Sequence, residues 1–204
     1  MSNEYDPITY EMLRFNANTG DALIFANTTL FSKLIRFGTQ SYASHIGFVV
    51  RDFVNDCLYI MESTTITTVN GQKSGVQISL LSERLKTCGC PVFYRPLQGV
   101  VRDDKFTETF KTFRAEMKGK RYERNWVQLA ASAVDFKWLN KLIDRPDLSS
   151  IFCSELYSEF LIRIGALPKY PYSNEYIPKE FTVEDDTVKW QNGVSLGNQF
   201  IIEC

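Results

Sequence analysis

The sequence of 204 residues contains a single histidine, His45, and no excess of either charge. Lysine and arginine number 23 against 24 aspartates and glutamates, so the formal net charge is -1. Nucleic-acid-binding proteins usually carry a basic excess, so this balance argues against a nucleic-acid partner. The chain also lacks an apolar run near the roughly 20 residues that a membrane span requires. Proton transfer at neutral pH would have to use His45 or a perturbed acid.

A secretory signal is also lacking, because residues 1–10 are polar and acidic, with no basic start and no apolar stretch. The five cysteines are irregularly spaced and odd in number, which does not suggest a disulfide framework. We therefore expect reduced thiols and a cytoplasmic location. Such thiols usually act as small buried hydrophobes, although one of them could be a nucleophile. They are Cys57, Cys88, Cys90, Cys153 and Cys204.

The length and the composition predict one globular domain over residues 1–204. Apolar residues make up 44% of the chain and aromatic residues 14%, which suffices for a core without disulfides and argues against disorder. We place the core at about 18–182, after an N-terminal extension (1–17) and before a C-terminal tail (183–204).

The order of patterns along the chain predicts an α+β fold. The first half carries five apolar runs of strand length, bounded by turn residues; they span 22–26, 45–50, 58–62, 76–80 and 91–95. Helical spacing occurs at 30–38, between the first two runs, and later at 103–119, 125–136 and 150–165. Short closing strands are expected at 188–190 and 199–202. Strands followed by helices, without βαβ alternation, indicate a mainly antiparallel sheet packed against helices.

Two ionisable residues of neighbouring predicted strands can meet. If Arg51 and Asp56 close the hairpin between these strands, His45 and Glu62 lie directly opposite each other on one face. A carboxylate there can fix the imidazole tautomer and leave the other ring nitrogen free as a base. The alternative is a histidine packed at the end of a strand.

Cys153 is the candidate nucleophile. It falls in the first turn of a helix that Ser149 or Ser150 can cap. A helix N-terminus favours a thiolate, and its N–H groups can receive an oxyanion. Ser154, next to Cys153, is grouped with the residues at this oxyanion and substrate site. A cysteine, a histidine and a carboxylate are the set that nucleophilic acyl transfer needs.

Other chemical motifs are weak. Cys88-Gly89-Cys90 has C-x-C spacing, and no second histidine exists to complete a common zinc set. Phosphate-binding and dinucleotide-binding glycine motifs are missing from the sequence. We therefore expect no metal and no organic cofactor.

Several motifs occur in the order known from one family. They are Gly20-Asp21-Ala22-Leu23-Ile24-Phe25, Ser44-His45-Ile46-Gly47-Phe48-Val49, Met61-Glu62-Ser63-Thr64, Gly75-Val76-Gln77-Ile78, Gly119-Lys120-Arg121-Tyr122-Glu123 and Phe152-Cys153-Ser154-Glu155-Leu156. Together they resemble the circularly permuted NlpC-type papain-like cysteine hydrolases, which include YiiX-like bacterial proteins and poxvirus relatives. Lecithin retinol acyltransferase is a more distant cousin of this family.

This resemblance implies a papain-like α+β fold with Cys153 as nucleophile, His45 as base and Glu62 as the orienting acid. It also places Tyr122 near the active site. Arg121 and Glu123 depart from the proline and aspartate of the family's Gly-x-Pro-Tyr-Asp motif, which affects the local loop and leaves the triad intact.

The function expected from these residues is hydrolysis or acyl transfer at an amide or ester bond through a thioester. A peptide and an acyl lipid are both open as substrates, and peripheral membrane or virion association stays open as well. The rival interpretation is a non-catalytic binding or virion-associated protein that keeps the fold.

Overall fold

A mixed sheet forms the centre of the computed structural model, which describes residues 5–26, 41–64, 74–122, 150–185 and 187–203. Its seven strands follow the order β1-β11-β6-β2-β3-β4-β5. All neighbours are antiparallel except β1 and β11, which are parallel. The strands are β1 (Asp6–Thr9), β2 (Ala22–Phe25), β3 (His45–Asp52), β4 (Cys57–Thr64), β5 (Gly75–Leu80), β6 (Val92–Arg95) and β11 (Phe200–Glu203).

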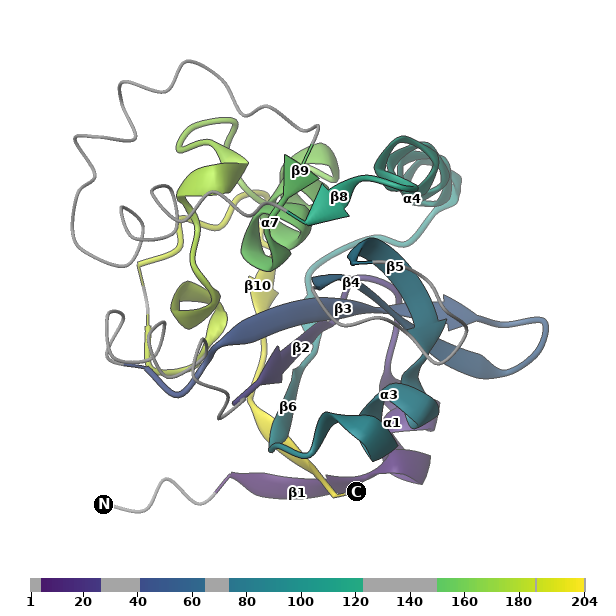
Figure 1. The fold of residues 1–204 in the computed structure, drawn as a ribbon. Helices are drawn as coiled ribbons and strands as arrows, with labels where there is room; N and C mark the ends of the chain where they lie inside the picture. Colours follow the sequence, from purple (N-terminus) through teal and green to yellow (C-terminus); the bar gives the residue numbers. More distant parts are fainter. Residues whose placement is uncertain (1–4, 27–40, 65–73, 123–149, 186, 204) are drawn as a thin grey trace.

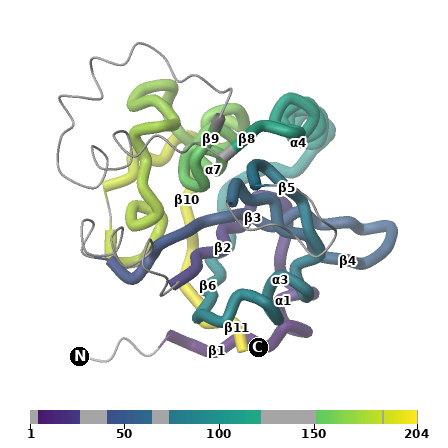
Figure 2. Tube along the Cα trace, viewed as in Figure 1, coloured from purple at the N-terminus to yellow at the C-terminus, as the bar shows by residue number. Residues whose placement is uncertain are grey.

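Four α-helices in the described part of the chain cover the two faces of this sheet (Figure 1). Helices α4 (Asp104–Met117) and α7 (Cys153–Arg163) lie on one face, and α1 (Tyr10–Asn16) and α3 (Leu81–Cys88) lie on the other. The trace in Figure 2 shows the same layers without the ribbon. The fold is therefore α+β with a mostly antiparallel sheet, as the sequence predicts.

Short elements complete the described structure. Two small sheets and two 3-10 turns lie outside the large sheet: β7 (Leu97–Gln98) with β10 (Ser195–Leu196), β8 (Arg121–Tyr122) with β9 (Ser150–Ile151), η1 (Ser173–Glu175) and η2 (Pro178–Phe181). The pair β8–β9 matters for the site, because β9 leads directly into α7.

Strand β3 shows how the sequence builds both faces. Its side chains alternate, so Phe48 joins the apolar cluster under α4 and α7 while Val49 joins the cluster under α1 and α3. Phe48 stacks on Phe160 of α7, with ring centroids 4.8 Å apart. Such a pair adds about 0.5–1.5 kcal/mol beyond the buried area and fixes α7 across β3.

The five strands predicted in the first half of the sequence are confirmed as β2 to β6. The helix predicted from 103 is also confirmed, because the Asp103 carboxylate accepts the Phe106 N–H at 2.9 Å and caps α4. The expected helices at 30–38 and 125–136 lie outside the described residues.

Other expectations for the two ends of the chain were wrong or incomplete. Residues 188–190 form no strand, and β10 lies at 195–196 instead. The strand expected at 199–202 is confirmed as β11. Within the expected N-terminal extension, β1 pairs with β11 and Leu13 of α1 is fully buried. Both ends therefore add strands to the large sheet.

No helix in the described ranges is long and apolar enough to cross a membrane.

Candidate active site

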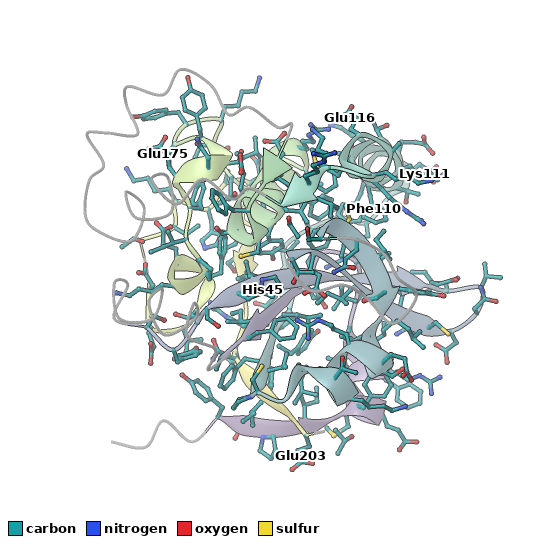
Figure 3. All side chains as sticks on the ribbon, in the orientation of Figure 1. His45, Phe110, Lys111, Glu116, Glu175 and Glu203 are labelled. Atoms are coloured by element: carbon teal, nitrogen blue, oxygen red, sulfur yellow. The ribbon has the colours of Figure 1, made fainter. Side chains whose placement is uncertain are left out.

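His45 begins β3, beneath the point where α7 approaches the sheet (Figure 3). Its Nε2 lies 2.6 Å from Oε2 of Glu62 on β4. Because Glu62 occupies Nε2, Nδ1 is the ring nitrogen left for a second partner. The carboxylate is 1% exposed, so this pair operates almost without solvent screening.

The predicted pairing of His45 directly opposite Glu62 is wrong by two residues. Glu62 pairs with Gly47, and the pair next to the hairpin turn is Asp52 with Cys57. The Asp52 carboxylate accepts backbone N–H groups of the following loop at 2.9 and 3.2 Å, so the strand runs further than assumed. Side chains repeat every two residues along a strand, so a two-residue shift keeps His45 and Glu62 on one face.

Arg84 of α3 holds the other side of the carboxylate. Its Nε donates to Glu62 Oε1 at 2.7 Å and its Nη2 donates to Oε2 at 3.3 Å. The guanidinium also lies over the Phe25 ring, 4.6 Å from the centroid, and that ring lies 5.3 Å from the His45 ring. A buried carboxylate with two cationic partners stays ionised.

Cys153 is the first residue of α7 and is 7% exposed. The predicted caps were wrong, because Ser150 belongs to β9 and Ser149 lies outside the described residues. Phe152 occupies the cap position, and its backbone N–H donates to Glu155 Oε2 at 3.2 Å. A carboxylate in the first turn thus replaces the expected hydroxyl cap.

The thiol of Cys153 is hydrogen-bonded to the imidazole of His45. Burial raises the pKa of Cys153, but the charge and the hydrogen bond of His45 outweigh it and lower the pKa. Backbone hydrogen bonds from Ile46 and Ser154 lower it further. A backbone group that favours the thiolate must be an N–H donor, so the sulfur faces two such donors.

The pKa values of His45 and Glu62 shift in opposite directions, and each shift favours the charged form of its group. Burial lowers the pKa of His45, but Cys153 and Glu62 outweigh it and raise the pKa to about 9. Burial raises the pKa of Glu62, whereas His45 and Arg84 bring it down to about 2. These directions favour a thiolate–imidazolium pair backed by an ionised carboxylate.

The other two predicted site residues are Tyr122 and Ser154. Tyr122 is in β8, where its backbone pairs with Ile151, two residues before the thiol. Ser154 follows Cys153 within α7 and is buried, and its carbonyl accepts the Ser158 hydroxyl at 2.8 Å. In addition, the Ser63 hydroxyl donates to the Ile151 carbonyl at 2.6 Å and so connects β4 to β9, which leads into α7.

Sequence reasoning missed Arg84. The stretch 81–88 has apolar Leu81 and Leu85 four residues apart, which is a weak helical signal in so short an element. A stronger clue was Glu62 itself, because a carboxylate inside an apolar strand requires a cation. In the described ranges, no group of three or more His, Cys, Asp and Glu side chains is arranged to hold a metal ion.

No protein-family model matches the sequence, and no curated protein matches it. Among solved structures, the chain is similar to the crystal structure of the metalloprotein YiiX from Escherichia coli O157:H7, with a TM-score of 0.49 and 19% sequence identity. The similarity covers 71% of this chain and 64% of that chain, so it spans less than two thirds of the YiiX chain.

Proposed function

We propose that this protein is a cysteine hydrolase or acyltransferase that cleaves an amide or ester bond through a thioester. The observation that carries the proposal is the hydrogen-bonded series from Cys153 through His45 and Glu62 to Arg84. The series supplies a nucleophile, a proton carrier and an orienting acid in order. Tight burial of the acid keeps the imidazole in one orientation.

In the first half of the proposed reaction, the Cys153 thiolate attacks the substrate carbonyl. The carbonyl π electrons move to oxygen, and the His45 imidazolium gives its proton to the leaving nitrogen or oxygen. The carbon–heteroatom bond breaks, which leaves a thioester on Cys153 and a neutral imidazole. Glu62 stabilises the imidazolium before this step and fixes the tautomer after it.

In the second half, neutral His45 takes a proton from water, and the resulting hydroxide attacks the thioester carbonyl. The carbon–sulfur bond breaks, and the thiolate and the imidazolium are restored together. An alcohol or amine in place of water would give acyl transfer by the same proton movements.

The oxyanion of both steps is assigned to the N-terminal end of α7. Backbone N–H groups there, including that of Ser154, combine with the helix dipole to stabilise negative charge. Tyr122 is proposed as a further substrate-binding residue because β8 runs beside Ile151. These steps use only groups of the chain itself.

The fold is proposed to be the circularly permuted papain-like one, because His45 precedes Cys153 and the quoted motifs follow that family's order. A single domain over 1–204 is part of this proposal. Peptides and acyl lipids are both retained as substrate classes.

Acyl-enzyme trapping tests the proposal. The full chain is mixed with p-nitrophenyl acyl esters and peptide p-nitroanilides, quenched in acid and analysed by peptide mass mapping. We expect one acyl group on Cys153, removed by hydroxylamine as a thioester is, with continued release of nitrophenol or nitroaniline. Cys153→Ala should abolish both signals.

Cys57→Ser is the matched control, because Cys57 is a half-exposed thiol on β4 outside the proposed site. This variant should acylate and turn over as the parent protein does. Turnover that survives in Cys153→Ala, or acylation confined to other cysteines, would contradict the assignment and favour the non-catalytic binding protein.

A further inference from the structure

Two further thiols, Cys88 and Cys90, lie at the C-terminal end of α3. This helix is on the face of the sheet opposite α7 (Figure 1). Cys88 is the last residue of the helix, Gly89 is its left-handed C-cap with φ 58° and ψ 24°, and Cys90 follows. Both thiols are reduced and partly exposed. No atom outside the turn lies within 4 Å of the position that a Cβ on Gly89 would take, so this side of the turn is open.

Several groups act on the Cys88 thiol. It donates to the Leu85 carbonyl at 3.1 Å and to the Cys90 carbonyl at 3.3 Å, which favours its protonated form, and its side chain is also hydrogen-bonded to the Cys90 thiol. That thiol bond, together with the Arg84 charge, lowers the pKa of Cys88 to about 6 against the opposing effect of burial. The thiolate is the nucleophilic form of cysteine, so Cys88 is the attacking sulfur of the pair.

The backbone also suits a bond between the two sulfurs. A disulfide requires Cα atoms about 4.4–6.8 Å apart. Residues two apart in an extended chain lie about 6.6–7.2 Å from each other, at or beyond that limit. The left-handed conformation of Gly89 bends the chain between Cys88 and Cys90 and brings them closer. A disulfide in so tight an exposed turn is strained, and strained disulfides are the easily reduced, reversible ones.

We propose that Cys88-Gly89-Cys90 is a thiol–disulfide exchange site that reacts with low-molecular-weight disulfides such as glutathione disulfide. This site is separate from the proposed hydrolase centre and does not depend on it. Its product is a reversible disulfide between Cys88 and Cys90.

The exchange has two balanced steps. The Cys88 thiolate attacks one sulfur of glutathione disulfide, the sulfur–sulfur bond breaks, and one glutathione leaves as a thiolate that takes a proton from water. Cys90 then loses its proton, and its thiolate attacks the Cys88 sulfur and displaces the second glutathione. The protein gives up two electrons, and glutathione disulfide is reduced to two glutathiones.

The experiment uses the full chain at pH 6 with glutathione disulfide, followed by acid quenching, alkylation and tryptic mass mapping. One tryptic peptide, residues 87–102, contains both cysteines and no other. We expect this peptide to lose two hydrogens and to retain no glutathione, and reduced glutathione should reverse the change. Cys153 is scored on its own peptide.

Cys90→Ser separates the two steps, because the serine hydroxyl can still donate a hydrogen bond while the second step is blocked. This variant should stop with one glutathione on Cys88. At pH 6, a thiol of pKa about 6 is expected to react about tenfold faster than one of about 8.5, after its lower intrinsic nucleophilicity is included. Cys57 provides the comparison within the same molecule.

Three results would overturn the proposal. The first is a glutathione adduct that persists on Cys88 in the parent protein. The second is glutathione addition to Cys88 of Cys90→Ser that is no faster than addition to Cys57. The third is a disulfide that joins Cys88 to a cysteine other than Cys90. The experiment does not measure acyl-transfer activity. A failure of the thiol exchange proposal therefore leaves the hydrolase proposal unchanged, and a failure of the hydrolase proposal leaves this one unchanged.

Discussion

Among the described residues, two thiols with lowered pKa values lie at opposite ends of their helices, on opposite faces of one sheet. Cys153 begins α7 and is buried, whereas Cys88 ends α3 and is partly exposed. The pKa of each is lowered, but by different partners: an imidazole for Cys153 and a second thiol for Cys88. The helix dipole supports a thiolate at the first position and opposes one at the second.

This difference matches the two reactions proposed for these cysteines. Cys153 has a neighbour that can carry a proton to and from a substrate, as acyl transfer requires. Cys88 has a neighbour that can form a bond to it, as disulfide exchange requires. Arg84 links the two regions, because it binds Glu62 directly and lowers the pKa of Cys88 through its charge.

The largest expected effect is that of His45→Ala, which should change the reactivity of Cys153 and leave that of Cys88 unchanged. His45→Ala should lower turnover by about 10²–10⁴-fold, because the chain has no second histidine to act as base. It should also raise the pKa of Cys153, since the imidazole that lowers it is removed. Iodoacetamide labelling near pH 6 should therefore drop at Cys153 and stay unchanged at Cys88. Equal losses at both thiols would point to unfolding instead of a local role.

Arg84→Gln tests the link between the two regions. Glu62 would lose a buried cationic partner, which typically costs about 3–5 kcal/mol of unfolding free energy. The pKa of Cys88 should rise as well, because the Arg84 charge is one of its causes. Urea unfolding and the pH dependence of Cys88 alkylation measure the two effects. If Arg84→Gln does not fold, Arg84→Lys is used instead. It keeps the positive charge, so the pKa of Cys88 should stay lowered.

The pH dependence of stability isolates Glu62. Its folded pKa of about 2 lies below the ordinary 4.5, so its contribution is present above pH 4.5 and is lost as the pH falls through about 2. A shift of this size corresponds to a contribution on the order of 3 kcal/mol. The stability gap between the parent protein and Glu62→Gln should therefore close across this range. A gap that stays constant would mean that Glu62 is not ionised in the folded state.

The smallest effect comes from the same helix as Arg84. Lys86 pairs with Glu83 at 3.0 Å, but their side chains are 70% and 55% exposed. Lys86→Gln should change the unfolding free energy by at most about 0.5 kcal/mol, as expected for an exposed pair on a helix. Alkylation of Cys153 and Cys88 should be the same as in the parent protein. A large effect here would show that any change in α3 disturbs both sites, and would weaken the argument from Arg84.

Local pattern predicted the strands that carry His45 and Glu62, because alternating or continuous apolar runs between turn residues specify strands directly. It also predicted α4, whose aspartate cap and apolar spacing agree. The hairpin register was harder, since it depends on side-chain bonds of Asp52 that no hydrophobic pattern encodes. The predicted register was wrong by two residues, which leaves His45 and Glu62 on the same face of the sheet and therefore still close to each other.

Short helices, an unusual helix cap and one nonlocal contact account for most of what was missed. Helix α1 has seven residues and α3 has eight, which is too short for a strong periodic signal. The cap of α7 uses a main-chain N–H and Glu155 in place of a serine. The Arg84–Glu62 contact spans 22 residues and two elements, so only the three-dimensional fold reveals it.

The parallel pairing of β1 with β11 has a consequence for the order of folding during synthesis. Residues 6–9 leave the ribosome long before their partner strand, residues 200–203, which emerges only after all the other described elements. Strand β6, which β11 also covers, keeps an unpaired edge until that moment. An exposed edge is a template for pairing with another nascent chain, so aggregation risk should be highest just before the last strand joins the sheet.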